Sequence, residues 1–450
     1  MKIIIIGAGE LGCLLAERLS ASANDITIID FSREGFTRLR DKLDVMTLAG
    51  DATNIEIMKK AGIEHADLLL AVSGDQAANI LACQIAGHFG VKKSICRLYS
   101  FEVFSEKDGL TPEFFGIGRA FSSPAECARK VLDVLHRRIV LERVIFSNPD
   151  ATMVTTVISP NSPLKGLRIK DLPGVEILNN IRFAALVRGH QLMFPHGETV
   201  LFPNDKIYVA GRRDYVEDFL NSASEETDLK KQLVIIAGAT RLCEIIAHDV
   251  LKTGMAVRVI ESSAEAAEQF LTRMPPGVMV VQGSATDKEV LNEAGIDCCD
   301  TFVSTADDDE NSILCCIIAK RLGARKVIAV THKPEYISIV PVMDVIDCGF
   351  NSTLVSVNTV FRLMEEGTIR IDSRLQAFQA YLTEFTVKPN AQLDGKLLKD
   401  CRLPTALVLA MIFRGNEVIT PAGSTMLQAG DVVVTIVTPA SEQQIKPFFE

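Results

Sequence analysis

Apolar runs alternate with amphipathic stretches along the first 120 residues of the chain. These runs have the length and the Ile, Leu and Val content of buried strands, and they lie at 2–6, 26–30, 45–48, 68–72 and 94–98. Strands that alternate with helices at this spacing predict a parallel sheet with right-handed crossovers. Ser123 and Pro124 then begin another predicted helix, as N-cap and first helical residue, which runs to about Arg138.

The same pattern occurs twice in the chain. Residues 233–261 repeat the strand, glycine turn, helix, strand and acid of residues 2–30, so that Asp30 aligns with Glu261 at an offset of 231. A smaller motif of short strands with Arg-Gly and Pro-x-Gly turns also recurs. It carries Arg188 and Asp205 in its first copy and, 226 positions later, Arg414 and Asp431 in its second.

The two repeats predict a chain made of two copies of a two-domain module. The fold class is α/β, with two tandem Rossmann-like parallel-sheet domains, each followed by a small α+β domain that is rich in strands. The polar stretch at 221–231 is the expected linker between the copies. The predicted domains are 1–138, 139–221, 232–368 and 369–450.

Composition narrows the class of protein. A chain of 450 residues with 48% hydrophobic and 23% charged residues is globular, and its net charge of −10 disfavours nucleic acid as a partner. No apolar run approaches the roughly 20 residues that cross a bilayer, so we expect a cytoplasmic protein unless a partner holds it at a membrane. The 11 cysteines form no Cys-x-x-Cys pair and the 7 histidines show no ligand spacing. Free buried thiols and no metal site are therefore expected.

A glycine-rich loop follows the first predicted strand. The segment Gly7-Ala8-Gly9-Glu10-Leu11-Gly12 leads into a helix, and Asp30 ends the next strand, which is the context of a dinucleotide-binding fingerprint. Gly7 permits the tight turn, Gly9 lets the backbone approach a pyrophosphate, and Gly12 lets the helix pack close to the sheet. Asp30 can accept hydrogen bonds from an adenosine ribose, and its charge disfavours NADP. A glycine turn kept only for packing is the alternative.

Further candidate residues follow the other strands, because open α/β sheets bind ligands at the carboxyl ends of their strands. They are Asp51, Ala52 and Thr53 after the third strand, Ser73, Gly74 and Asp75 after the fourth, and Arg97 at the end of the fifth. An arginine in an apolar strand is costly unless it meets an anion, which predicts that Arg97 binds phosphate. A salt bridge from Arg97 to Asp51 or Asp75 is the alternative.

The second copy departs from this pattern. Thr240 and Cys243 stand at the positions of the second and third loop glycines, and Val330 stands at the position of the arginine. Glu261 retains the ribose-binding role in principle. The acidic run at 307–310 is either a solvated helix start or a cation site, and its charge would repel phosphates. The second pocket is therefore predicted to bind nucleotide weakly or not at all.

At these motifs the sequence resembles the TrkA family, the cytosolic subunits of bacterial Trk potassium-uptake systems. The motifs are GAGELG at 7–12, GDAT at 50–53, and AVSGD at 71–75 leading into NILAC at 79–83. The modules of this family resemble RCK domains, the regulators of potassium conductance, and the resemblance covers essentially the whole chain. It assigns ligand contacts to Gly7, Gly9, Gly12, Asp30, Asp51, Ser73 and Arg97.

The resemblance implies a non-enzymatic regulator that is peripheral to the inner face of the cell membrane. Its partner would be an integral-membrane potassium transporter, and it would form a homo-oligomer, a dimer or a tetramer. NAD(H), or alternatively ATP or ADP, would tune its conformation. Family members often carry two intact glycine loops, and this chain departs from the family there.

Two rival functions remain open to the sequence. An NAD-dependent dehydrogenase would need a substrate domain with a positioned acid or base, and the β-rich units contain no such cluster in the sequence. A regulator of a potassium efflux system or another cation channel is the second rival. Single-copy modules are usual in those systems, so two copies on one chain favour the Trk type.

Overall fold

The computed structural model describes the 450-residue chain except residues 21–23, 34, 41–42, 136, 138, 190, 224–231, 341–342, 344, 365–368, 372–379, 402, 404–406 and 438. Most of the predicted linker at 221–231 and the predicted domain limits 138 and 368 lie outside the described residues, so the domain boundaries stay a prediction. No described helix has the length and apolar character needed to cross a membrane. The chain divides into two compact units, residues 1–129 with 331–336 and 351–365, and residues 130–330 with 337–350 and 366–450.

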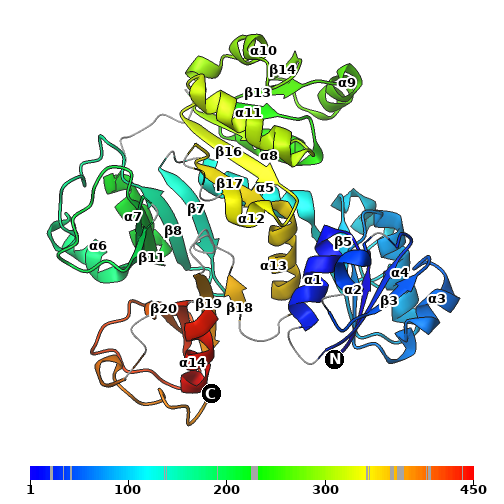
Figure 1. Ribbon diagram of the computed structural model, residues 1–450, viewed down its shortest axis with the longest axis horizontal. Helices are drawn as coiled ribbons and strands as arrows, with labels where there is room; N and C mark the ends of the chain where they lie inside the picture. The colour runs from blue at the N-terminus through cyan, green and yellow to red at the C-terminus, as the bar shows by residue number, and fades with distance from the viewer. Residues whose placement is uncertain are drawn as a thin grey trace. The chain divides into compact units, whose positions relative to one another are not determined.

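The first unit contains a six-stranded sheet in the order β3-β2-β1-β4-β5-β6, in which neighbouring strands are parallel (Figure 1). Its strands are β1 (Lys2–Ile6), β2 (Asp25–Asp30), β3 (Met46–Ala49), β4 (Leu68–Ala71), β5 (Lys93–Leu98) and β6 (Arg119–Ser122). The five predicted strands are confirmed, with ends that differ by at most one residue. The sixth was not predicted, because Arg-Ala-Phe-Ser is short and contains no apolar run.

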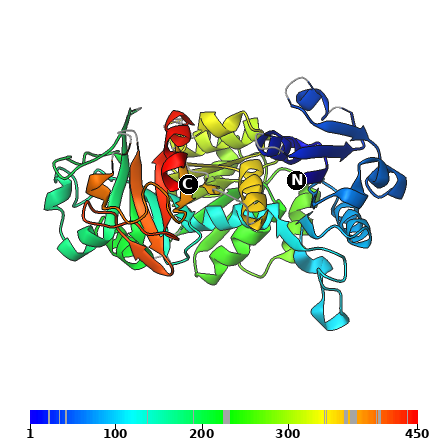
Figure 2. The ribbon, with the colours of Figure 1, turned by 90° about the horizontal axis from the view of Figure 1, so that it is seen from below.

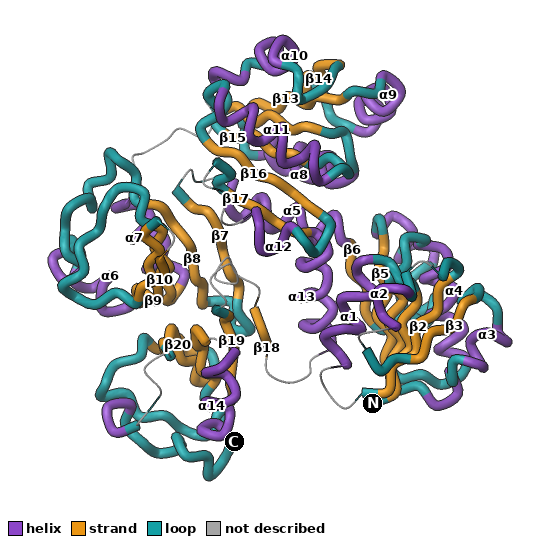
Figure 3. The backbone as a smooth tube through the Cα atoms, viewed as in Figure 1, coloured by secondary structure: helices purple, strands orange, loops and turns teal. Residues whose placement is uncertain are grey.

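Helices cover both faces of this sheet (Figure 3). They are α1 (Glu10–Ser20), α2 (Thr37–Arg40), α3 (Ile55–Lys60) and α4 (Gln76–His88). The helix α5 (Ser123–Leu135) follows β6. Alternate residues of β1 point to opposite faces: Ile5 packs with Leu15 of α1, and Ile4 packs with Cys83 of α4. The helix predicted from Ser123 begins at that residue.

The second parallel sheet repeats the strand order of the first, β14-β13-β12-β15-β16-β17, so the predicted duplication and fold class are confirmed. Its strands are β12 (Leu233–Ala237), β13 (Ala256–Glu261), β14 (Val278–Gln282), β15 (Thr301–Ser304), β16 (Lys326–Thr331) and β17 (Cys348–Asn351). Its helices are α8 (Arg241–Lys252), α9 (Ala264–Arg273), α10 (Lys288–Glu293), α11 (Asp309–Arg321) and α12 (Tyr336–Ile339).

The helix α13 (Ser352–Met364) belongs by sequence to the second copy but packs in the first compact unit. Figures 1 and 2 both show it beside α1, and its buried side chains Val357, Val360 and Met364 share one apolar core with Leu15. The hydroxyl groups of Ser356 and Ser123 are 2.8 Å apart, which also joins α13 to the start of α5. The predicted domain 232–368 includes α13, and the sequence gave no indication that this helix packs in the first unit.

Two small antiparallel sheets complete the fold, in the orders β10-β9-β11-β8-β7 and β18-β19-β22-β20-β21. The first contains β7 (Val140–Ile145), β8 (Ala151–Val157), β9 (Ile181–Arg188), β10 (Gln191–Met193) and β11 (Lys206–Arg212), with α6 (Val175–Asn180) and α7 (Arg213–Ala223). The second contains β18 (Ile369–Ile371), β19 (Tyr381–Thr386), β20 (Val408–Arg414), β21 (Glu417–Ile419) and β22 (Val432–Val437), with α14 (Pro439–Phe449).

The repeated Arg-Gly and Asp positions form the same ion pair in both small sheets. Arg188 donates two hydrogen bonds to Asp205, at 2.8 and 2.7 Å, and Arg414 donates two to Asp431, at 2.9 and 2.8 Å. Each pair is bidentate, which fixes the hairpin against the following strand. These hydrogen bonds raise the pKa of both arginines above the ordinary value. The motif recognised in the sequence is thus structural.

The two small sheets pack on each other through a shared apolar core within the second compact unit. The rings of Phe146 and Phe413 lie edge to face with centroids 5.9 Å apart. Beside this core the backbone N–H of Ser147 donates to Glu384 at 3.0 Å. Glu384 is 5% exposed, and burial raises the pKa of its carboxyl group above the ordinary value.

Candidate functional site

The glycine loop connects β1 to α1 in a tight turn. Gly7 has a φ of 101°, and a β-carbon there would lie 2.7 Å from Cα of Ser73. A β-carbon at Gly12 would lie 1.8 Å from the carbonyl oxygen of Gly7, so no other residue fits at either position. A β-carbon at Gly9, in contrast, would meet nothing within 4 Å. The first and third glycines therefore pack the loop, and the second leaves open space above it.

The start of α1 offers unused hydrogen-bond donors to that space. In the part of the chain that the structure describes, no group accepts a hydrogen bond from the backbone N–H of Gly9, Leu11 or Gly12. The side chain of Leu11 is buried, and Glu10 begins the helix. A helix N-terminus with unpaired N–H groups and open space beside Gly9 favours a bound anion such as a phosphate.

Asp30 is held beside this loop at the end of β2. Its carboxylate accepts hydrogen bonds from the N–H groups of Ala8, at 2.6 Å, and Ser32, at 2.8 Å. The backbone carbonyl of Asp30 also accepts from the N–H of Gly50, at 2.9 Å, which ties the end of β2 to the loop after β3. Asp30 therefore has a fixed position, with lone pairs left for a ribose hydroxyl.

The residues after β3 form a small turn of their own. Oδ1 of Asp51 accepts hydrogen bonds from the hydroxyl of Thr53, at 2.7 Å, and from its N–H, at 2.8 Å. The hydroxyl contact and then the N–H contact lower the pKa of Asp51 below the ordinary value, so it is an anion at neutral pH. Ala52 is buried between these two residues.

The ends of β4 and β5 are joined by a residue that the sequence analysis gave no role. The buried amide of Asn79 accepts from the hydroxyl of Ser73 at 2.7 Å and from its N–H at 3.0 Å. The same amide donates to the carbonyl of Arg97 at 3.0 Å. Gly74 lies exposed beside them with room for a side chain. A buried asparagine in an otherwise apolar helix was the signal that could have identified this clamp.

Arg97 makes neither of the salt bridges considered as alternatives. Asp51 binds Thr53, and Asp75 caps α4 by accepting from the N–H groups of Ala77 and Ala78. Among the described residues, the guanidinium of Arg97 has no acidic partner within 4 Å and only a 3.5 Å contact to the carbonyl of Val72. Burial lowers its pKa from the ordinary value. A partly desolvated cation of this kind is stabilised by an anionic ligand.

In the second copy a side chain fills the position that is open in the first. The hydroxyl of Thr240, at the place of Gly9, accepts a hydrogen bond from the N–H of Cys243 at 3.3 Å and so caps α8. Glu261 nevertheless holds its loop as Asp30 does, accepting from the N–H groups of Ala239 and Ser263, each at 2.8 Å. The acid therefore also positions the loop, independently of a ligand.

The acidic run at 307–310 is the start of a helix. Asp308 is the N-cap of α11 and accepts from the N–H of Asn311 at 2.7 Å, while Asp309 is buried and not solvated as one alternative expected. Within the described part of the chain, no three His, Cys, Asp or Glu side chains gather as metal ligands.

With this geometry in view, comparison with known proteins identifies the family. Residues 3–103 and 234–347 match the TrkA-N domain, and residues 153–224 and 382–450 match the TrkA-C domain. The chain belongs to the TrkA family. The order of the four matches is the predicted alternation of large and small domains.

Curated relatives of the TrkA family match along their whole length. The chain is 29% identical to the Trk system potassium uptake protein TrkA homolog of Archaeoglobus fulgidus, with all of both chains covered. It is 28% identical to the Trk system potassium uptake protein TrkA of Halomonas elongata, with 97% of this chain and 96% of that protein covered.

Solved structures with the same fold include the GsuK RCK domain and a GsuK channel described as bound to NAD. The first has a TM-score of 0.62 at 16% identity and covers all of this chain and 94% of that one. The second has a TM-score of 0.59 at 16% identity and covers all of this chain and 78% of that one. The likeness identifies the tandem TrkA-N and TrkA-C domains as an RCK fold.

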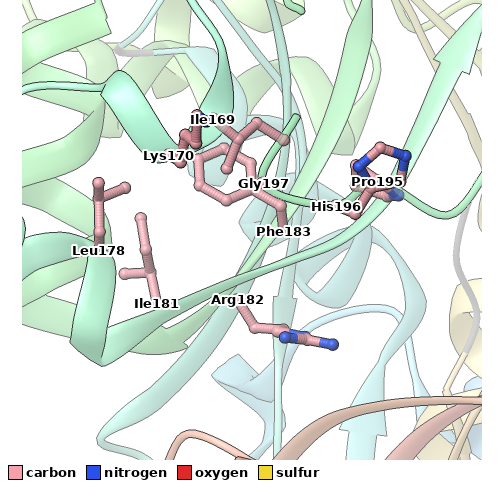
Figure 4. A pocket seen from close by; sticks show the side chains of 9 residues that line it. All are labelled: Ile169, Lys170, Leu178, Ile181, Arg182, Phe183, Pro195, His196 and Gly197. Carbon is pink, nitrogen blue, oxygen red and sulfur yellow. The ribbon is translucent and has the colours of Figure 1, made fainter. Parts of the chain in front are cut away.

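A cavity of about 180 Å³ lies in the first TrkA-C domain. Figure 4 shows the nine side chains that line it. They are Ile169, Lys170, Leu178, Ile181, Arg182, Phe183, Pro195, His196 and Gly197. The second TrkA-C domain has Val408 and Ala422 at the positions of Arg182 and His196, so the two small domains also differ in charge.

Proposed function

We propose that this chain is the cytosolic regulatory subunit of a membrane potassium-uptake transporter. Its first TrkA-N domain binds NAD(H), or ATP or ADP, and the bound nucleotide gates the membrane partner. The chain assembles as a homo-oligomer at the inner face of the cell membrane. Support comes from relatives named as Trk potassium uptake proteins and from a fold shared with a channel described as bound to NAD.

One observation carries the nucleotide-binding part of this proposal. The helix N-terminus above Gly9 has open space and unpaired N–H groups, whereas the hydroxyl of Thr240 occupies the equivalent position in the second copy. A diphosphate over Gly9 would accept hydrogen bonds from those N–H groups, and Asp30 would accept from the ribose. Arg97, near the end of β5, would meet phosphate charge.

The nucleotide acts in this proposal as a ligand and not as a reactant. Binding shifts an equilibrium between two conformations only by its differential affinity for them. NAD and ATP share the adenosine and diphosphate but differ beyond it, so they can favour different conformations. Arg97, which has no acidic partner among the described residues, is the side chain best able to respond to that difference.

Calorimetric titration of the full-length protein with NAD, NADH, ATP and ADP tests the binding. Replacing Gly9 by Thr gives the first loop the residue of the second, and Gly9→Val adds a branched side chain without a hydroxyl. Both variants should lose binding while their melting temperatures stay close to that of wild type. Unchanged affinity in both would remove the site from this loop.

Potassium uptake in cells that lack their own regulator tests the coupling to transport. Wild-type protein should restore nucleotide-dependent uptake, and Gly9→Val should not respond to nucleotide. Uptake that is the same with and without this protein would contradict the regulatory role and reopen the dehydrogenase and efflux-channel alternatives.

A further inference from the structure

The segment after Asp30 leaves one large apolar side chain in solvent. Phe31 is 78% exposed, the highest value for a large apolar residue among those that the structure describes. Phe36, at the end of the same segment, is buried, and a β-carbon at Gly35 would lie 2.1 Å from the carbonyl oxygen of Ala8. The end of the segment therefore packs closely against the glycine loop, whereas Phe31 at its start is exposed.

The backbone of Phe31 is held on both sides. Asp30 before it binds the N–H of Ala8, and the same carboxylate binds the N–H of Ser32 after it. Asp30 pairs with Ala49 across the sheet, so Phe31 stands next to the turn of Asp51 that follows β3. The backbone thus holds an exposed aromatic residue next to the acid proposed to bind the ribose, at the carboxyl ends of β2 and β3.

The second copy provides an internal comparison. Ser262 occupies the position of Phe31, and its hydroxyl contacts Glu261 at 3.2 Å. The aromatic side chain is present in the copy with the open glycine loop and absent from the copy in which Thr240 caps the helix. The two copies share the fold, so the fold does not explain the difference at this position. The difference matches the proposed difference in nucleotide binding.

Given the nucleotide site proposed above, on which this step rests, we infer that the phenyl ring of Phe31 stacks on the nucleotide base. The base is attached to the ribose that Asp30 would bind, so it would lie next to the exposed ring of Phe31. Stacking on an aromatic side chain contributes affinity for any base, because every base has a π face. Phe31 therefore contributes to the affinity for the base, while the diphosphate and ribose contacts determine where the nucleotide lies.

The test uses the full-length protein, ADP as the ligand, and two substitutions. Phe31→Ser installs the residue of the second copy and should weaken ADP binding about tenfold or more without lowering the melting temperature. Phe31→Trp keeps an aromatic face and should bind ADP as wild type does. The chain contains no tryptophan, so this variant carries a single tryptophan, whose fluorescence should be quenched by stacking on adenine.

Phe114→Trp is the matched control, because Phe114 is 58% exposed in the same unit but lies on the connection between β5 and β6. Its fluorescence should not change with ADP. Wild-type affinity in Phe31→Ser together with unquenched Phe31→Trp would overturn the stacking and leave the nucleotide site intact. Wild-type protein that binds neither ADP nor NAD would overturn both proposals.

Discussion

The ammonium group of Lys326 donates a hydrogen bond to the carbonyl oxygen of Val134 at 2.6 Å. It also donates to the carbonyls of Arg137, at 3.0 Å, and Val140, and its side chain is 2% exposed. Three acceptors match the three donors of a charged ammonium, and the last carbonyls of α5 carry the negative end of the helix dipole. Lys326, the first residue of β16, thus ties the second parallel sheet to the end of α5 and to the start of β7.

We expect Lys326→Met to destabilise the protein by about 3 kcal/mol, because it leaves several buried carbonyls without a donor. Urea unfolding measures this directly. Lys320→Met is the control, since Lys320 pairs with Asp347 at 2.6 Å where the two side chains are 28% and 25% exposed, and the change should matter by less than about 1 kcal/mol. Equal losses in the two variants would contradict a special role for Lys326.

Replacing Arg97 by Met separates ligand binding from stability. Burial lowers the pKa of Arg97, which means that the folded protein disfavours the charged side chain when no anion is present. The Met variant should therefore melt at the same temperature as wild type or higher, yet bind ADP at least ten times more weakly. A lower melting temperature with unchanged ADP affinity would show that Arg97 is structural.

The two TrkA-N domains should bind nucleotide unequally. Titration of the full chain should give one site per chain, and Gly9→Thr should remove it. Thr240→Gly, which uncaps α8, should not create a second site, because Val330 and Asp307 stand where the first copy has Arg97 and Gly74. Two sites of equal affinity in wild-type protein would show that the second loop tolerates its threonine.

The sequence predicted the parts of the fold that depend on local pattern. The strand at 2–6, the glycine turn and the acid at position 30 form a continuous unit whose periodicity and turn residues agree, and the repeat of that unit gave the domain order. The strand β6 was not predicted, because its four residues are too few to show a periodic pattern.

Tertiary contacts between distant segments could not be predicted from the sequence. Nothing in the pattern around Lys326 indicates three carbonyls almost 190 positions earlier, and nothing in α13 indicates that it packs on α1. Arg188 and Asp205 were recognised as a motif, but their pairing required the hairpin to be seen. The clamp at Asn79 was missed for the same reason, since its partners lie on two strands.

A pH dependence is expected at the contact between the small sheets. Burial raises the pKa of Glu384 in the folded protein above its value in the unfolded chain, which is about 4.3. The folded state therefore binds this proton more tightly, and the resulting stability is fully present below the unfolded pKa. It is lost as the pH rises through the folded pKa, so ionised Glu384 destabilises the folded protein at neutral pH.

Glu384→Gln should accordingly raise the melting temperature at pH 7.5 and change it little at pH 4, since the amide oxygen can still accept from the N–H of Ser147. Glu198→Gln is the control of opposite sign, because the hydrogen bond from Lys170 lowers the pKa of Glu198 on an exposed surface. That variant should be neutral or slightly less stable at pH 7.5. The measurement is thermal unfolding of the three proteins across this pH range. A Glu384→Gln variant that melts below wild type at pH 7.5 would mean that the charged carboxylate stabilises the contact and that desolvation is not the dominant effect there.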